Sequence, residues 1–160
     1  MNFMTLASVA ELGSHPAMAL ILGGIVAAFL RGRAASLCLV IAPVLGLWYV
    51  WTLDVGSSSS IVLFGQEIHS VFVDRQAKLF GYLFHLAALI AGIYSFHLRD
   101  PWQVSMGLLY AATAVGVAFA GDMLSLFLWW EGLAVTSVFQ IWCRRTERSE
   151  QAGFRYLFFH

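Results

Sequence analysis

Long apolar runs, each close to the length of a membrane-crossing helix, are the feature that most restricts how this chain can fold. A helix rises about 1.5 Å per residue, so roughly 20 apolar residues cross the 30 Å hydrocarbon layer of a bilayer. Five such runs lie between polar, Gly or Pro breaks, at about residues 16–30, 35–53, 79–97, 102–120 and 122–142. A sixth helix starts at about residue 152. The pattern predicts an all-α membrane protein with five transmembrane helices plus the start of a sixth.

The composition agrees with a surface that faces lipid. Hydrophobic residues make up 60% of the chain and charged residues 11%, whereas soluble domains carry roughly 25% charged residues. Basic and acidic residues cancel to a net charge of +0, so nucleic acid is not expected as a partner. Cys38 and Cys143 lie far apart without a CxxC motif, which favours packing roles. We expect no metal and no cofactor, because the chain has neither a cysteine cluster nor a GxGxxG motif.

The distribution of basic residues predicts an orientation in the membrane. Six arginines follow the first, third and fifth runs: Arg31, Arg33, Arg99, Arg144, Arg145 and Arg148. By the positive-inside bias these ends are cytoplasmic, and the N-terminus is extracytoplasmic. Arg75 and Lys78 run against this assignment. The first residues contain no Lys or Arg but do contain Glu11, so the first helix is expected to be retained rather than cleaved as a signal peptide.

A β-hairpin is expected between the second and third runs, at about residues 60–73 on the extracytoplasmic side. Two short strands, about residues 60–64 and 67–73, flank a turn at Gly65 and Gln66. An isolated hairpin is marginally stable in water. We therefore expect it to rest on the membrane domain or on a neighbouring subunit.

Glu131 lies near the centre of the fifth run, at about the depth of the bilayer midplane. Insertion scales put the cost of a charged side chain at that depth at roughly 2.5 to 3.5 kcal/mol. Helical spacing places Glu131 on one face with Leu124, Phe127, Leu128, Val135 and Val138. Gly132 and Thr136 form an adjacent strip of small residues suited to a close helix neighbour. We expect Glu131 to point into a protein interior, with the fourth run, rich in small residues, as that neighbour.

Two roles for Glu131 follow from its position. It is either a structural acid bound to a hydroxyl such as that of Thr113, or a group that gains and loses a proton. The second role is favoured, because Glu131 is the only charge well inside the five runs. Burial in a low-dielectric site favours the neutral carboxyl, so Glu131 is expected to bind and release a proton.

Three other residues are candidates for a proton relay. Asp122 lies nine residues before Glu131, about 13 to 14 Å along the axis, and helix capping is the favoured explanation for it. His85, inside the third run, could relay protons, ligate a haem in a cytochrome-like anchor, or donate a hydrogen bond, and the last is favoured. His160 is the last residue. His15 and His97 are expected at the membrane interface.

Three segments carry a family resemblance: FVDRQAKLFGYLFHLAALIAGIYSFHLRD, GDMLSLFLWWEGLAVTSVFQIWCRR and TERSEQAGFRYLFFH. They resemble the antiporter-like membrane subunits shared by Mrp-type cation/proton antiporters and proton-pumping respiratory complex I, and most of all the D-type component of the Mrp antiporters. The resemblance covers roughly residues 64–160. The D-x-x-x-x-F-x-x-W-E pattern that begins at Asp122 and ends at Glu131 is its most specific part.

The resemblance implies a function as well as a fold. Glu131 takes the place of the family's proton-translocating glutamate, whose usual partner is a lysine in the seventh helix, beyond the end of this chain. Family members are built from two inverted repeats with broken helices. The chain is therefore expected to be the N-terminal part of a longer subunit, or half of a split one, with the lysine supplied by the missing C-terminal part or a companion chain.

The expected setting is the bacterial inner membrane. Expected partners are the lipid bilayer and other antiporter or respiratory-complex membrane subunits. The chain is expected to be an ion transporter subunit and not an enzyme. The alternatives are a membrane subunit of a complex I-like or hydrogenase-like assembly, and a non-catalytic assembly subunit in which Glu131 holds helices together.

Overall fold

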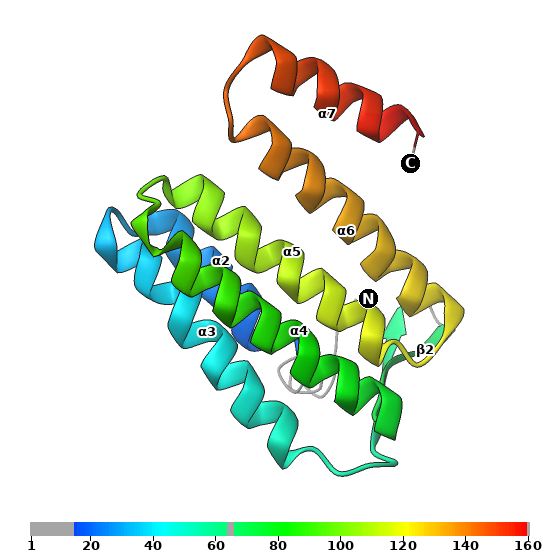
Figure 1. Ribbon diagram of the computed structural model, residues 1–160. Coiled ribbons are helices and arrows are strands. Elements are labelled where there is room, and N and C mark those ends of the chain that lie inside the picture. The colour runs from blue at the N-terminus through cyan, green and yellow to red at the C-terminus, as the bar shows by residue number, and fades with distance from the viewer. Residues whose placement is uncertain (1–14, 64–65, 160) are drawn as a thin grey trace, which may run out of the picture.

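The computed structural model describes residues 15–63 and 66–159 (Figure 1). The elements in order are α2 (Met18–Phe29), α3 (Arg33–Thr52), β1 (Ser58–Leu63), β2 (Gln66–Phe72), α4 (Arg75–Tyr94), η1 (Ser95–His97), α5 (Pro101–Phe119), α6 (Met123–Trp142) and α7 (Glu147–Phe159). Within these residues, four helical segments are long and apolar enough to cross a membrane: Arg33–Thr52, Arg75–His97, Pro101–Phe119 and Met123–Trp142. The helix α2 is apolar but shorter, with 12 residues.

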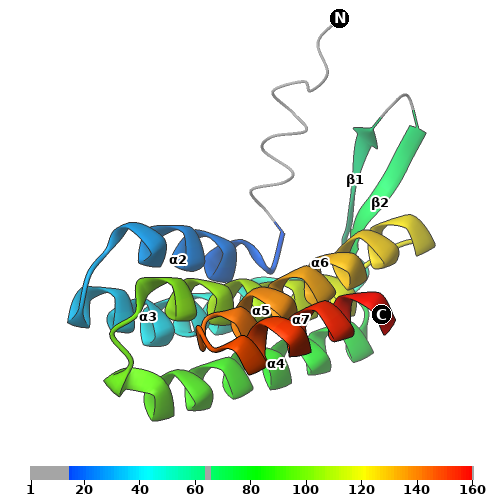
Figure 2. The ribbon, with the colours of Figure 1, turned by 90° about the horizontal axis from the view of Figure 1, so that it is seen from above.

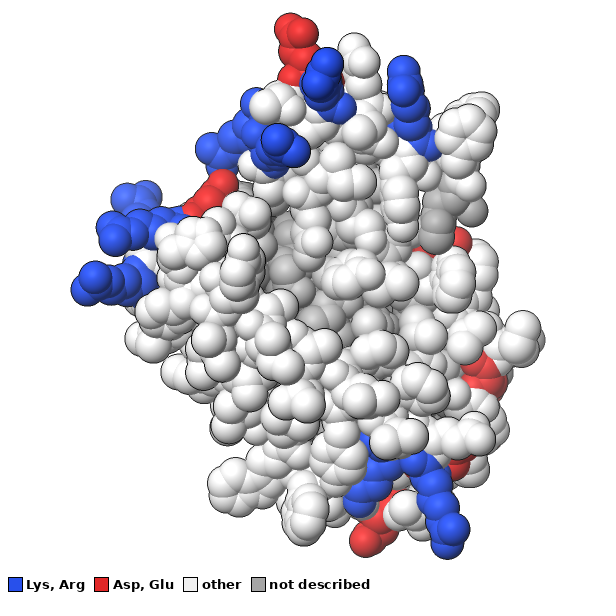
Figure 3. Space-filling model, in the orientation of Figure 1, with Lys and Arg blue, Asp and Glu red and all other residues white. Residues whose placement is uncertain are grey.

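The helices α2, α3, α4 and α5 pack against one another, α6 packs against α5, and α7 packs against α6 (Figures 1 and 2). Buried core residues come mainly from α2, α3 and α5, and include Leu20, Leu39, Leu108 and Phe119. Many large apolar side chains nevertheless face outward, as a bilayer-facing surface requires. Figure 3 shows Lys and Arg gathered at the two ends of the molecule, with a mainly uncharged band between them. The arrangement is that of a helical multi-pass membrane protein.

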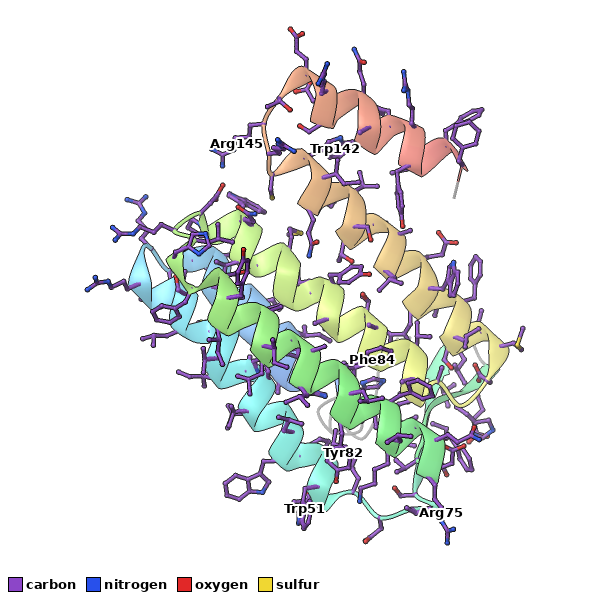
Figure 4. All side chains as sticks on the ribbon, viewed as in Figure 1. Trp51, Arg75, Tyr82, Phe84, Trp142 and Arg145 are labelled. Carbon is purple, nitrogen blue, oxygen red and sulfur yellow. The ribbon has the colours of Figure 1, made fainter. Side chains whose placement is uncertain are left out.

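The helix α4 begins at Arg75, rather than at about residue 79 as predicted. The Asp74 side chain caps it by accepting a hydrogen bond from Ala77 N. Lys78 lies in the first turn, and its Nζ donates to the carbonyl oxygens of Leu53 and Trp51 at the end of α3. Trp51 and Arg75 lie at this same end of the molecule in Figure 4. The prediction started too late because charged residues were assigned to the loop, whereas here they begin the helix.

The helix α7 begins at Glu147, rather than at about residue 152. Thr146 and Ser149 cap its start reciprocally, because each backbone N–H donates to the other's hydroxyl, at 3.0 and 3.2 Å. Trp142, labelled in Figure 4, faces α7, and its ring lies 5.4 Å from that of Phe154. Because Thr146 and Ser149 cap its start, α7 begins earlier than the apolar segment from which it was predicted.

The predicted hairpin is confirmed. Strands β1 and β2 are antiparallel, pairing Ser58 with Phe72 at one end and Leu63 with Gln66 at the other. The hairpin projects from the end of the bundle where α6 begins (Figure 2). Gly65, half of the predicted turn, lies outside the described residues, and Gln66, the other half, is the first residue of β2 rather than a turn residue. The hairpin rests on the bundle, as expected, because the carbonyl oxygen of His69 accepts hydrogen bonds from Gly121 N and Ser125 Oγ, both at 3.1 Å.

Candidate functional site

Asp122 caps the N-terminus of α6, as predicted. Its carboxylate accepts hydrogen bonds from Ser125 N at 2.6 Å and from His69 N at 2.7 Å, and Ser125 Oγ in turn accepts from Asp122 N. Partial desolvation opposes ionisation of Asp122, but these backbone donors outweigh it and hold the pKa of the carboxyl below its usual value. Asp122 therefore joins the hairpin to α6 and fixes where that helix starts.

The contact between α5 and α6 sets the rotation of α6. A Cβ atom at Gly116 would lie 2.1 Å from the Trp129 ring, so only glycine admits this indole. A Cβ atom at Gly132 would lie 3.0 Å from Thr113 Cγ2. Both the expected neighbour of α6 and the close approach at Gly132 are thus confirmed. Ala134 and Val138 of α6 are also buried.

Glu131 is exposed in the structure, and the expectation that it points into a protein interior is wrong for the part of the chain that the structure describes. It lies on α6 among exposed side chains, Leu124, Phe127, Leu128 and Val135. The helical wheel correctly grouped these residues on one face, except for Val138, which is buried. The grouping could not say which face meets α5, because α6 is apolar on almost every side.

The carboxylate of Glu131 has no hydrogen-bond or ion-pair partner among residues 15–63 and 66–159. Thr113, the hydroxyl considered as its partner, donates instead to the carbonyl oxygen of Tyr110 at 2.8 Å. Asp122 is the N-cap and Glu131 lies more than two turns further along the helix, so the two acids do not meet. The site is therefore a single acid on an open apolar face at the middle of a helix long enough to cross a membrane.

His85 is fully buried between α4 and α3. Its Nδ1 lies 2.8 Å from the carbonyl oxygen of Gly81; since a carbonyl only accepts, Nδ1 donates, as the favoured sequence interpretation expected. Its Nε2 has no hydrogen-bond partner in the described chain. Gly46 of α3 abuts this edge of the ring, because a Cβ atom there would lie 2.1 Å from Nε2. An axial haem ligand needs an open ring nitrogen, and His85 does not fit that role.

Replacing Gly46 with Ala is expected to lower the free energy of unfolding by about 1 to 3 kcal/mol, because the added methyl group overpacks against the His85 ring. The measurement is thermal unfolding of the purified protein in detergent. Gly107→Ala is the matched control, since its Cβ atom would meet only Gln140 Nε2, at 3.8 Å, and Ala favours helix. Equal stability of the two variants would contradict the close approach of Gly46 to His85.

His15, which is predicted to lie at the membrane interface, is buried within the protein. Its ring stacks on Trp129 with the centroids 4.8 Å apart, its Nδ1 accepts from Ala17 N at 3.1 Å, and its Nε2 has no partner in the described chain. Burial lowers the pKa of His15 to about 4, and the backbone of Ser70 offsets this only in part. No sequence signal marks this histidine, because its burial depends on contacts with the distant α6.

His160, the remaining candidate for a proton relay, lies outside the described residues. A hollow of about 430 Å³ lies between α4 and α5 and reaches Gln140 of α6, but Glu131 does not line it. Within the described chain, no three His, Cys, Asp or Glu side chains gather as a metal site would require.

Comparison with known proteins places the chain in no family, since no protein-family profile, curated protein or solved structure matches it.

Proposed function

We propose that this chain is part of a proton-translocating membrane subunit of a multisubunit cation/proton antiporter, in which Glu131 carries the proton. The observation that supports the proposal is the position of Glu131, the one charged side chain of α6, on an open face of that 20-residue helix. A carboxyl group in this setting has to be protonated, hydrated or paired with a cation. A carboxyl group that is protonated in one state and ionised in another can take up a proton and later release it.

The open face also favours a partner helix. Leaving Glu131 ionised against lipid costs several kcal/mol, so we propose that another helix covers the α6 face around it and supplies a lysine. That helix belongs to the C-terminal part of the full subunit or to a companion chain. An ammonium group offers three donors to a carboxylate and can release its own proton when desolvated, which suits a transfer pair.

In the proposed setting the protein lies in the bacterial inner membrane, with five transmembrane helices and the start of a sixth. The arginine-bearing ends are cytoplasmic, and the N-terminus and hairpin are extracytoplasmic. The gathering of Lys and Arg at both ends of the molecule supports a membrane-spanning placement (Figure 3). The larger number of arginines at the end that holds Arg33, Arg99 and Arg145 supports the proposed orientation. Lys78, which runs against the positive-inside bias, is engaged by α3 carbonyl oxygens.

The function is tested in everted membrane vesicles from cells that lack the full-length subunit. Vesicles from these cells are compared with vesicles from the same cells carrying the subunit on a plasmid. We expect addition of a monovalent cation to collapse the pH gradient only when the subunit is present. Co-purification of the other subunits shows whether the assembly forms in each case. Loss of flux together with loss of assembly would favour the assembly role, and unchanged flux without the subunit would reject the proposal.

Asp122→Asn separates helix capping from proton relay at Asp122. Asn keeps one acceptor oxygen, so we expect it to lose the second hydrogen bond, costing about 1 kcal/mol of stability, and to leave cation-dependent proton flux within about twofold of the wild type. Asp122→Ala loses both bonds and should be less stable than the Asn variant. Flux and thermal unfolding are measured on the same preparations. A stable Asn variant without flux would place Asp122 in the proton path instead.

A further inference from the structure

A second hollow, of about 380 Å³, lies where α3 begins and α4 ends. We call it the arginine pocket; it is lined by Arg33, Phe96, His97 and Arg99. Arg33 is the first residue of α3, and the other three come from η1 and the segment that follows it. The pocket lies at the end of the bundle that carries the arginine-rich loops.

The two sides of the arginine pocket are held together by a partly buried hydrogen bond. Ser36, in the first turn of α3, is fully buried, and its Oγ donates to the carbonyl oxygen of Leu98 at 2.7 Å. The backbone N–H of Leu98 donates to Ser95 O at 2.9 Å. Arg33 and Arg99 lie within a few residues of this junction, on either side of it. Their backbones are therefore fixed relative to one another even though their side chains are exposed.

The positive charge of the arginine pocket is not neutralised by the described protein. Asp100, next to Arg99, is already engaged: its Oδ2 pairs with Arg145 Nη2 at 3.0 Å, and its Oδ1 accepts from Trp102 N. Neither Arg33 nor Arg99 forms an ion pair within residues 15–63 and 66–159. A guanidinium group presents planar donors that match the oxygens of a phosphate. Two such groups lining one pocket provide donors for a phosphate group.

Apolar surface adjoins the pocket on the side of the membrane. Leu37 lies one turn from Arg33 along α3 and is 48% exposed. Ile90 and Ile93 share a face with His97 on α4 and η1, and are 60% and 61% exposed. A ligand with an anionic head and long apolar chains would contact both surfaces at once.

We propose that the arginine pocket binds the headgroup of an anionic phospholipid, such as phosphatidylglycerol or cardiolipin. The lipid phosphate contacts Arg33 and Arg99, and its acyl chains lie along the exposed apolar residues of α3 and α4. Basic pockets between transmembrane helices on the cytoplasmic side are typical lipid-headgroup sites. The inference rests on the proposed membrane location but not on proton transport through Glu131.

The test is native mass spectrometry of the full-length subunit in its purified assembly, titrated with dioleoylphosphatidylglycerol, cardiolipin or dioleoylphosphatidylcholine. We expect the wild type to retain the two anionic lipids in preference to phosphatidylcholine. The Arg33→Gln/Arg99→Gln pair should weaken anionic-lipid binding about ten- to thirtyfold, since each arginine near a membrane surface contributes roughly fivefold. The Arg144→Gln/Arg148→Gln pair removes the same charge from the same end of the protein and should bind as the wild type does.

Several results would overturn the proposal. If the two Gln pairs weaken anionic-lipid binding equally, the binding reflects a diffuse surface potential. If the wild type retains phosphatidylcholine as well as it retains the anionic lipids, the binding reflects apolar contacts alone. Displacement of the lipid by millimolar inorganic phosphate would assign the pocket to a free anion. If the Gln pair does not assemble, Arg33→Lys/Arg99→Lys keeps the charge and should keep the preference for anionic lipid; its loss of that preference in an intact assembly would also reject the anionic-lipid site.

Discussion

Under the proposed antiporter function, replacing Glu131 with Gln is expected to reduce cation-dependent proton flux through the assembly by about tenfold or more, while the assembly itself still forms. Gln has nearly the shape of Glu and keeps its hydrogen-bonding capacity, but it cannot gain or lose a proton in this pH range. Removing a positioned proton-transfer group commonly costs 10² or more in rate. Because Glu131 is exposed on the described chain, the change removes no internal contact of α6. The measurement is collapse of the pH gradient in everted vesicles on addition of a monovalent cation.

Two further variants make the Glu131 result interpretable. Glu147→Gln makes the same chemical change at an exposed acid in the first turn of α7, away from the centre of α6, and should leave the flux unchanged. Glu131→Asp keeps a titratable carboxyl on a shorter side chain and should keep part of the flux. Full flux with Glu131→Gln would reject the proton-carrying role. If each assembled complex carries the normal flux but the variant yields far fewer assembled complexes than the wild type, a structural role for Glu131 is supported instead.

Acidification from pH 6.5 toward pH 4 is expected to destabilise the fold through His15 by about 3 kcal/mol in total. The pKa of His15 is about 4 in the folded state and 6.5 in the unfolded state. Between pH 6.5 and pH 4 the unfolded state therefore binds a proton that the folded state does not bind. The contribution of neutral His15 is complete above pH 6.5, falls as the pH drops, and stops changing below about pH 4. Protonation would leave a charged ring buried against Trp129, with only partial compensation from the backbone of Ser70.

The His15 contribution is isolated by comparing the wild-type protein with His15→Phe, which keeps an aromatic ring against Trp129 but cannot titrate in this range. Other acids titrate in both proteins, so the difference between their stability curves reports His15 alone. Thermal unfolding in detergent at half-unit steps from pH 7 to pH 4 gives both curves. Parallel curves across this window would show that His15 is protonated freely in the folded protein.

The apolar runs were sufficient to predict most of the helices. A bilayer has a fixed thickness and offers no hydrogen bonds to the backbone, so a spanning segment must be a helix of about 20 residues. For this reason the runs at about 35–53, 102–120 and 122–142 correspond closely to α3, α5 and α6. Helix starts in polar sequence were predicted less well. Arg75 and Glu147 begin helices because Asp74 and Thr146 cap them, and hydropathy does not register capping.

The candidate site also has features that the sequence predicted and features that only the structure shows. Sequence alone identified Glu131 as the acid at the middle of a spanning helix and Asp122 as the cap of that helix, because both conclusions need only position along the chain. It could not show that the Glu131 face lies away from α5, since a helix that is apolar on every side has no polar stripe to set its rotation. That rotation is decided by Trp129, which packs at Gly116.

The sequence by itself determined where the apolar segments and the hairpin lie along the chain, and which acid lies deepest in an apolar helix. These properties depend on residue type and spacing. Only the tertiary structure decided that His15 is buried, that His85 abuts Gly46, and that His69 joins the hairpin to Asp122. Each of these contacts joins residues far apart in the chain, and its energy comes from packing and hydrogen-bond geometry, which leave no periodic pattern in either segment.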